Sequence, residues 1–119
     1  MKKILVVEDN EINMYLCCRI LKSSGYEVIE ARSGEEGVEL TIKEKPDLII
    51  MDIQLPGIDG LETTKRIRES EADDEIPIIA LTSYAMAGDK KKALKAGCTG
   101  YVEKPINPDT LLGEIKKYL

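Results

Sequence analysis

A small set of polar side chains in this sequence follows directly after short apolar runs, where buried strands would end. The set comprises three carboxylates, one hydroxyl and one ammonium group: Glu8, Asp9, Asp52, Thr82 and Lys104. Three carboxylates held close together repel one another unless a positive charge lies between them. An oxygen-only set with room for water suits Mg²⁺, which prefers octahedral coordination. Such a cation, together with the lysine, would neutralise a phosphoryl group carried by a carboxylate, which can act as a nucleophile in phosphoryl transfer.

The run before Asp52 shows why these side chains are expected to meet. Residues 48–51 are apolar at successive positions, which is typical of a strand covered on both faces in a parallel sheet. Asp52 ends the run, and a loop containing Pro56, Gly57 and Gly60 follows. Open α/β sheets bind ligands at the carboxyl ends of their strands, so the sequence predicts a carboxylate in a cleft at that edge.

The rest of the chain completes an alternation of strands and helices. Strands are predicted over residues 2–7, 26–31, 48–51, 76–81 and 100–103. Helices are predicted over residues 11–24, 34–44, 61–70 and 84–96, and from Asn107 or Asp109 to the end, with Asn10 and Ser33 as candidate N-caps. This alternation predicts an α/β fold in which a five-stranded parallel sheet carries helices on both faces.

The spacing of apolar residues predicts which side of each helix is buried. In the first helix the inward stripe consists of Leu16, Cys17, Ile20 and Leu21. Tyr15 and Cys18 fall on the opposite side, so Tyr15 is expected to be exposed. In the second helix Val38 and Ile42 are expected to face inward.

Composition argues against several kinds of partner and chemistry. The net charge of −5 disfavours nucleic acid as a partner, since a broad basic face is absent. The longest apolar runs are far too short for a membrane span or a signal peptide, so a cytoplasmic location is expected. The chain has no histidine, which removes catalytic triads and phosphohistidine chemistry within it. Its three cysteines lack metal-ligand spacing and are interpreted as reduced thiols, buried or half-buried.

Four pieces of the sequence resemble the receiver domain of two-component response regulators, and the resemblance covers the whole chain. These pieces are the acidic pair Glu8-Asp9, Asp52 with its loop in MDIQLPGIDG, Thr82 in IIALTS, and Lys104-Pro105 in YVEKPI. The segments EDNEINM and AMAGDKKKALKAGC are similar to receivers of hybrid histidine kinases and to stand-alone DivK-type regulators. The resemblance implies a flavodoxin-like fold with strand order 2-1-3-4-5, and a single receiver domain over residues 1–119 with no effector domain.

The resemblance also implies how a phosphoryl group would be held. Asp52 would accept it from a phosphohistidine on a sensor kinase or a histidine phosphotransfer domain. Asp9, Asp52 and the backbone carbonyl of Gln54 would bind Mg²⁺, for which Mn²⁺ can substitute, while Glu8 would act through a coordinated water. Lys104 would pair with Asp52 and with the phosphoryl group. The chain would then promote its own phosphorylation and dephosphorylation without being an enzyme for other substrates.

A switch is implied in the same way. Thr82 would move toward the phosphoryl group and Tyr101 would turn inward with it, while Gln54 and Tyr84 would tune the phosphoryl lifetime. The fourth helix, fifth strand and fifth helix would form the face that binds a downstream protein. Pro105 would follow Lys104 through a cis peptide bond, the isomer that X–Pro bonds tolerate best. The resting protein is expected to be monomeric, and dimerisation after phosphorylation is left open.

Partner docking rests on the residues beside the site. Tyr15, with Ile106 and Asn107, would dock the phosphodonor, because an exposed aromatic side chain can anchor a partner helix. The equal alternative is a tyrosine ring that merely lies along its own helix.

Three further functions compete with phosphorylation-dependent switching. The alternative within the fold is a receiver-like interaction module that works without phosphate, which the intact acidic set disfavours. A Mg²⁺-dependent hydrolase of small phosphoesters is disfavoured because no second acid stands two residues after Asp52. Flavin binding is disfavoured because no phosphate-binding loop follows the first strand.

Overall fold

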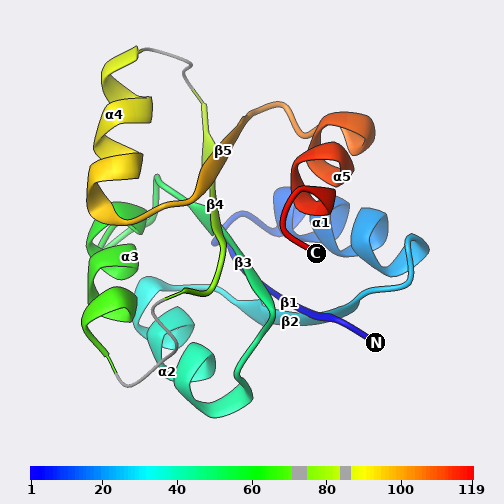
Figure 1. The fold of residues 1–119 in the computed structure, drawn as a ribbon, viewed down its shortest axis with the longest axis horizontal. Helices are drawn as coiled ribbons and strands as arrows, with labels where there is room; N and C mark the ends of the chain where they lie inside the picture. Colours follow the sequence, from blue (N-terminus) through cyan, green and yellow to red (C-terminus); the bar gives the residue numbers. More distant parts are fainter. Residues whose placement is uncertain (71–74, 84–86) are drawn as a thin grey trace.

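The apolar runs of the sequence form the strands of one parallel sheet (Figure 1). The structure is a computed structural model and describes residues 1–70, 75–83 and 87–119. The strands are β1 (Lys3–Val7), β2 (Glu27–Ala31), β3 (Leu48–Asp52), β4 (Ile78–Thr82) and β5 (Gly100–Glu103). The helices are α1 (Glu11–Ser23), α2 (Gly34–Glu44), α3 (Gly60–Glu69), α4 (Ala87–Ala96) and α5 (Pro108–Lys116). The strand order is β2-β1-β3-β4-β5, so the predicted flavodoxin-like topology is confirmed.

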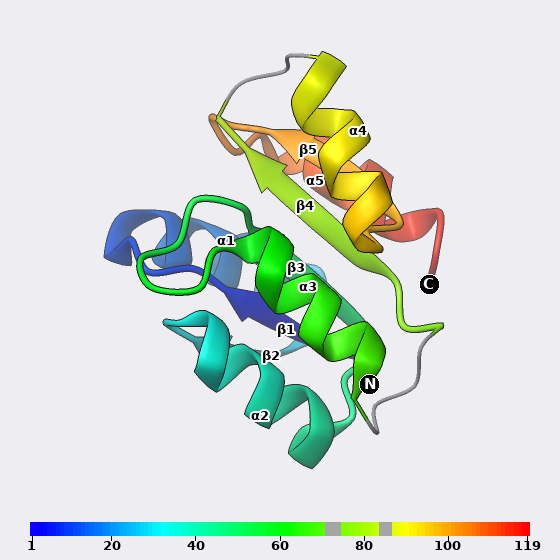
Figure 2. The same ribbon diagram turned by 90° about the vertical axis from the view of Figure 1, so that its left-hand side faces the viewer.

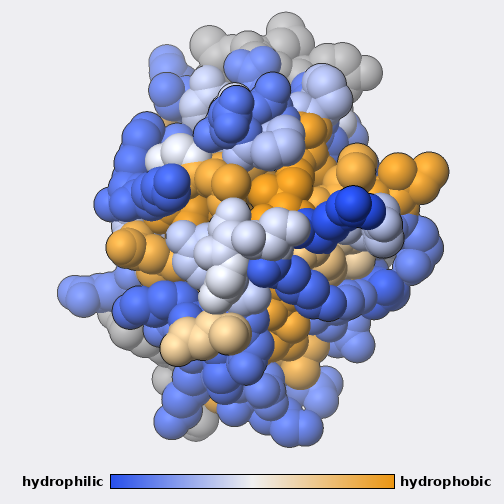
Figure 3. All heavy atoms as spheres, turned by 90° about the vertical axis from the view of Figure 1, so that its right-hand side faces the viewer, coloured by the Kyte–Doolittle hydropathy of each residue, from blue (hydrophilic) through white to orange (hydrophobic). Residues whose placement is uncertain are grey.

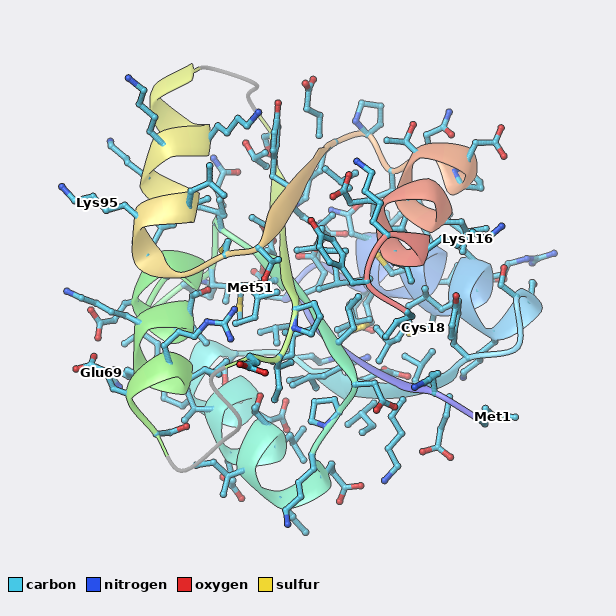
Figure 4. All side chains as sticks on the ribbon, viewed as in Figure 1. Met1, Cys18, Met51, Glu69, Lys95 and Lys116 are labelled. Carbon is cyan, nitrogen blue, oxygen red and sulfur yellow. The ribbon has the colours of Figure 1, made fainter. Side chains whose placement is uncertain are left out.

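Alternation along the strands divides the core into two halves, one on each face of the sheet. Ile4 and Val6 point toward α1 and α5, where they pack with Leu21 and Ile115. The neighbouring strand residues pack on the opposite face with α2, α3 and α4, which lie in front of the sheet in Figure 2. In Figure 4 the labelled Met51 lies inside this second half of the core, while Lys95 extends outward from α4. Both faces are therefore covered, which explains why the strands are apolar at successive positions.

Local signals in the sequence set the helix ends. The side chains of Asn10, Ser33, Asp59 and Asn107 accept hydrogen bonds from backbone N–H groups in the first turns of α1, α2, α3 and α5. Gly60 also permits a close approach, because a Cβ atom there would lie 2.2 Å from the carbonyl oxygen of Asp52. The start of α3 is thereby held against the end of β3.

The inward stripe predicted for α1 was partly wrong. Cys18 is buried and Leu16 is 40% exposed, the reverse of the expectation, and Met14 joins the core. Apolar residues extend around much of this helix, so their spacing does not fix its rotation on the sheet. The confirmed part of the stripe is Cys17 and Leu21, which are both fully buried.

The prediction for α2 was wrong at Ile42, which is 38% exposed. The buried side of this helix consists of small residues, Gly34, Gly37 and Thr41. A Cβ atom on Gly37 would lie 2.9 Å from a methyl group of Val7, so the helix packs too close to β1 for a large side chain. Thr41 satisfies its hydroxyl by donating to the Gly37 carbonyl at 2.7 Å.

Two other expectations concern the cysteines and the membrane. Cys17, Cys18 and Cys98 are all free thiols, as predicted, and all three are buried, including Cys18, which was expected on the outer side of α1. Burial, followed by the nearby Glu8 carboxylate, raises the pKa of Cys17 to about 12, so this thiol stays protonated. None of the described helices combines the length and apolar character needed to cross a bilayer.

Candidate functional site

The carboxyl ends of the strands meet at one edge of the sheet. The arrowheads of β1 and β4 point to the same side in Figure 2. The register pairs Val7 with Met51 and Asp52 with Leu81, so β1, β3 and β4 end at nearly the same level. Thr82 is paired with Glu103 of β5 in the same way. The residues that follow these positions are thus neighbours although they are far apart in the sequence.

Three carboxylates gather at this edge. Glu8, Asp9 and Asp52 each place a carboxylate oxygen within 4.8 Å of the other two. Glu8 is completely buried and Asp52 is 2% exposed, whereas Asp9 is exposed. One oxygen of Asp52, Oδ1, accepts a hydrogen bond from the backbone N–H of Gln54 at 3.0 Å. The predicted acidic set therefore comes together, with one open side at Asp9.

Lys104 reaches the same cluster from the end of β5. Its Nζ atom lies 3.1 Å from Asp52 Oδ2 and 3.4 Å from Glu8 Oε1. Its backbone N–H donates to the carbonyl of Thr82 at 2.7 Å, and its peptide bond to Pro105 is cis, as predicted. Burial lowers the pKa of Lys104, but the charges of Asp52 and Glu8 outweigh it and the net pKa is raised. The side chain is thus a fixed ammonium ion.

One ammonium ion does not balance three carboxylates. Among the described residues, Glu8 Oε1 is buried without a hydrogen-bond partner, since Lys104 makes only a charge contact with it. The pKa of Glu8 is raised to about 7, first by burial and then by the adjacent Asp52 carboxylate, while the charge of Lys104 opposes both effects. A buried oxygen without a donor beside two more carboxylates fits a divalent cation bound by oxygen ligands. The acidic cluster is therefore compatible with Mg²⁺.

Two residues assigned to the switch lie on the neighbouring strands β4 and β5. Thr82 ends β4 and is 5% exposed. Tyr101 of β5 is half-buried, and the Nζ atom of Lys90 lies 5.0 Å from its ring centroid. Tyr84 lies outside the described residues. The hydroxyl of Ser83 donates to Gln54 Oε1 at 3.0 Å, a contact that the sequence did not predict because it joins two loops.

The predicted docking residues occupy different environments. Tyr15 is 59% exposed, and its hydroxyl accepts a hydrogen bond from Arg19 at 2.9 Å, so the ring lies along its own helix. The side chain of Asn107 caps α5 by accepting from the N–H groups of the two residues after Pro108. Ile106 is half-buried against the core.

The sequence analysis did not predict a second exposed surface on α1, which is more apolar than the surface around Tyr15. Ile12 is 71% exposed and Leu16 is 40% exposed on α1. A groove of about 410 Å³ runs between α1 and α5, with Leu16, Ile20, Ile106 and Leu112 among its lining residues. Figure 3, which views the side of the molecule that carries α1 and α5, shows hydrophobic atoms gathered between hydrophilic rims. Ile12 lies four residues before Leu16, so the two exposed side chains share one side of α1.

Comparisons with known proteins agree with this geometry. Residues 4–116 match the model of the response regulator receiver domain. The polar-differentiation response regulator DivK of Brucella ovis is 46% identical over 118 residues, which cover 99% of this chain and 96% of that protein.

Two solved structures are also similar along nearly the whole chain. One is the receiver domain of the sensor histidine kinase PA1611 from Pseudomonas aeruginosa PAO1, which has a magnesium ion coordinated in its active site cleft. It is 36% identical, with a TM-score of 0.91 and coverage of 98% of this chain and 96% of that chain. The other is the receiver domain of Ssk1 in complex with the histidine phosphotransfer protein Ypd1 from Saccharomyces cerevisiae. It is 32% identical, with a TM-score of 0.90 and coverage of 98% and 88%.

The fold, the clustered acids and the similarity along nearly the whole chain lead to the same assignment. This chain belongs to the response regulator receiver domain family of two-component signalling.

Proposed function

We propose that this chain accepts a phosphoryl group on Asp52 from a phosphohistidine donor and uses it to control the binding of a downstream protein. The observation that carries the proposal is the environment of the Asp52 carboxylate. One of its oxygens is fixed by the N–H of Gln54 and the other by Lys104, and two further carboxylates lie beside it. This arrangement suits a nucleophile that must be oriented and then neutralised.

The chemistry of transfer follows from these positions. An Asp52 oxygen forms a bond to phosphorus while the bond from phosphorus to the donor nitrogen breaks, and the imidazole leaves. Lys104 then lies within reach of a phosphoryl oxygen, because it already contacts Asp52 Oδ2. Thr82, at the end of the adjacent strand, is expected to donate its hydroxyl to another phosphoryl oxygen.

A bound Mg²⁺ would supply positive charge that offsets the phosphoryl oxygens and the clustered carboxylates. Asp9, Asp52 and the backbone carbonyl of Gln54 are its proposed ligands, and Glu8 would act through a coordinated water. Two findings support this assignment. The three carboxylates are within 4.8 Å of one another, and a receiver domain 36% identical to this chain holds magnesium in its active site cleft.

The switch would work by shifting the equilibrium between two arrangements of the residues around Asp52. Phosphorylation adds about −1.5 to −2 units of charge and new acceptor oxygens. Thr82 is proposed to move toward Asp52 so that it and Lys104 both bond to these oxygens, and Tyr101 is proposed to turn inward with it. Charge-assisted hydrogen bonds of about 1.5–3 kcal/mol each would shift the population toward that arrangement. The affected surface would be the α4–β5–α5 face, where Lys90 contacts the Tyr101 ring.

The phosphodonor would dock on the groove between α1 and α5. The exposed Ile12 and Leu16, with Ile106 across the groove, offer an apolar contact next to the acceptor site. Support comes from the similar receiver domain of Ssk1, which was crystallised with a histidine phosphotransfer protein. Tyr15 and Asn107 would contact the donor only at the margin of this groove, because the side chain of each is already held by a hydrogen bond within its own helix. We further propose that the chain acts in the cytoplasm as a single-domain regulator, monomeric at rest.

Incubation with acetyl phosphate and Mg²⁺, followed by intact mass measurement, tests the proposal. One phosphoryl group should be added to the native chain and to Asp47→Asn, whose exposed carboxylate lies at the opposite edge of the sheet. Asp52→Asn should take none. A native chain that stays unmodified yet binds a partner protein would instead favour an interaction module that works without phosphate.

A further inference from the structure

A groove lies between two of the helices that cover the second half of the core. α3 and α4 are neighbours over the same face of the sheet (Figure 2). The groove between them has a volume of about 470 Å³. Its lining includes two carboxylates, three ammonium groups and one leucine: Asp59, Glu62, Lys65, Lys92, Lys95 and Leu61. Leu61 and Lys65 are four residues apart on α3, and Lys92 and Lys95 are three apart on α4, so each helix turns one side to the groove.

Contacts beneath the groove hold its two walls in place. The hydroxyl of Thr64 lies 3.7 Å from Sγ of Cys98. Arg68 donates to the carbonyl of Gly97 at 3.0 and 2.8 Å. Both contacts join α3 to the residues that directly follow α4. The walls are therefore fixed before anything binds, and a ligand need not order them.

The charges that line the groove are not balanced. Asp59 accepts a hydrogen bond from the backbone N–H of Glu62 at 2.8 Å, and the Glu62 carboxylate pairs with Arg66 at 3.0 Å. Both acids thus already have a partner. The three lysine side chains are exposed, and none of them forms an ion pair within residues 1–70, 75–83 and 87–119. On a chain with a net charge of −5, the groove therefore offers a local excess of positive charge.

α4 turns a different side to this groove than to the proposed output face. Nζ of Lys90 lies 5.0 Å from the ring centroid of Tyr101 on β5. Lys92 follows two residues later, about 200° further around the helix, and lines the groove with α3. The groove is thus a separate surface from the one that contains Tyr101, and Asp52 does not line it.

We propose that the groove between α3 and α4 binds an acidic amphipathic helix of a partner protein. Leu61 and Ala96, both half-buried, form an apolar floor on which one apolar side chain of the partner can rest. Lys65 on one wall, and Lys92 and Lys95 on the other, would pair with carboxylates on both sides of that side chain. Binding at this surface does not depend on a phosphoryl group.

The same lysines fit nucleic acid less well. Three lysines release few counterions from a phosphate backbone, so they add little affinity for a polyanion. Asp59 and Glu62 at the start of α3 would repel the phosphates, whereas an amphipathic helix can place an uncharged residue there. The apolar floor also has no use in backbone binding.

Fluorescence anisotropy with a labelled acidic peptide tests the proposal. The probe is a helical peptide of about 18 residues, or about five turns, with leucines along one side and glutamates flanking them. The native chain should bind it. Lys92→Glu combined with Lys95→Glu should weaken binding about tenfold, because each reversal replaces an attraction by a repulsion. Leu61→Ala should weaken binding about three- to tenfold through the lost apolar contact.

A matched variant separates this groove from the overall charge of the protein. Lys22→Glu combined with Lys116→Glu makes the same change of charge on α1 and α5, which cover the opposite face of the sheet. It should leave binding within about twofold of the native value, because salt screens distant charges. Thermal melts of all variants check that each is folded.

Four results would overturn the inference. They are an absence of binding by the native chain, equal losses in the two double variants, equally tight binding of a peptide with lysine in place of each glutamate, and equally tight binding of single-stranded DNA. Because the measurement uses no phosphoryl group, its failure would leave the proposed role of Asp52 unaffected.

Discussion

Polar residues have different roles at the two edges of the sheet. At the carboxyl edge, Glu8 and Asp52 are buried side by side with one ammonium ion between them, and an oxygen of Glu8 lacks a donor among the described residues. At the amino edge, polar groups close the backbone. Arg68 donates through Nε and a terminal nitrogen to the carbonyl of Gly97 at 3.0 and 2.8 Å, and Thr99 accepts from a strand N–H at 3.1 Å.

The difference assigns ligand binding to the carboxyl edge and stability of the fold to the amino edge. Buried like charges cost free energy until a cation or a phosphoryl group changes the balance. Satisfied hydrogen bonds at the amino edge hold α3 and α4 to the sheet without any ligand. Substitutions at the carboxyl edge should therefore change phosphorylation most, and substitutions at the amino edge should change unfolding most.

The largest effect is expected from Lys104→Met. Removal of the ammonium ion leaves the transferring group without a preorganised cation, which should slow labelling by acetyl phosphate about 10²-fold. Lys117→Met, which removes an exposed lysine near the opposite edge, provides the matched control. Intact mass measured over time gives both rates, and equal rates in the two variants would contradict the contrast between the edges.

Next in size is Arg68→Ala at the amino edge. Loss of the charged donor to the Gly97 carbonyl should lower the free energy of unfolding by about 2 kcal/mol, with the labelling rate unchanged. Arg66→Ala, on the same helix, removes only an exposed pair with Glu62 and should cost about 0.3–0.5 kcal/mol. Urea unfolding followed by circular dichroism measures both changes. A slowed phosphorylation in Arg68→Ala would show that the edges are not independent.

Mg²⁺ should stabilise the fold through the carboxyl edge. At about ten times its dissociation constant, a bound cation adds about 1.4 kcal/mol, or a rise of about 5–6 °C in melting temperature. The rise should disappear in Asp9→Asn and persist in Asp47→Asn. Thermal melts with and without the cation show the effect, and an equal rise in both variants would argue for nonspecific binding.

The smallest effect is expected from Tyr118→Phe. The hydroxyl of Tyr118 shares one proton between the Thr99 carbonyl and a Glu114 carboxylate oxygen, each at 3.3 Å. Two long contacts at the surface should contribute about 0.5 kcal/mol, so the substitution should lower the free energy of unfolding by that amount. A loss as large as that of Arg68→Ala would mean that the hydrogen bonds at this edge act cooperatively.

The carboxyl edge could be predicted from the sequence to a large extent. Asp52 and Thr82 each end a continuously apolar run, and parallel strands bring such ends together. The cis peptide bond before Pro105 followed from the family resemblance. No pattern within a single segment contains the contact between Ser83 and Gln54, because each partner lies in a different loop.

Helix faces were less predictable for a physical reason. Leu16 and Cys18 are both apolar, and only the rotation of α1 on the sheet decides which is buried. In α2 the close approach to Val7 requires Gly37, and the fully buried positions carry no large apolar residue that a periodicity could reveal. Hydrophobic spacing detects large side chains in a core, and it fails where the contact depends on small ones.

The central claim is that the Asp52 carboxylate receives the phosphoryl group. Borohydride reduction of the protein after treatment with acetyl phosphate and Mg²⁺ converts a phosphorylated aspartate into homoserine, which peptide mass spectrometry can locate. We predict homoserine at position 52 alone, and none when Mg²⁺ is removed by a chelator. Homoserine at Asp9 or at Asp47 instead would contradict the account.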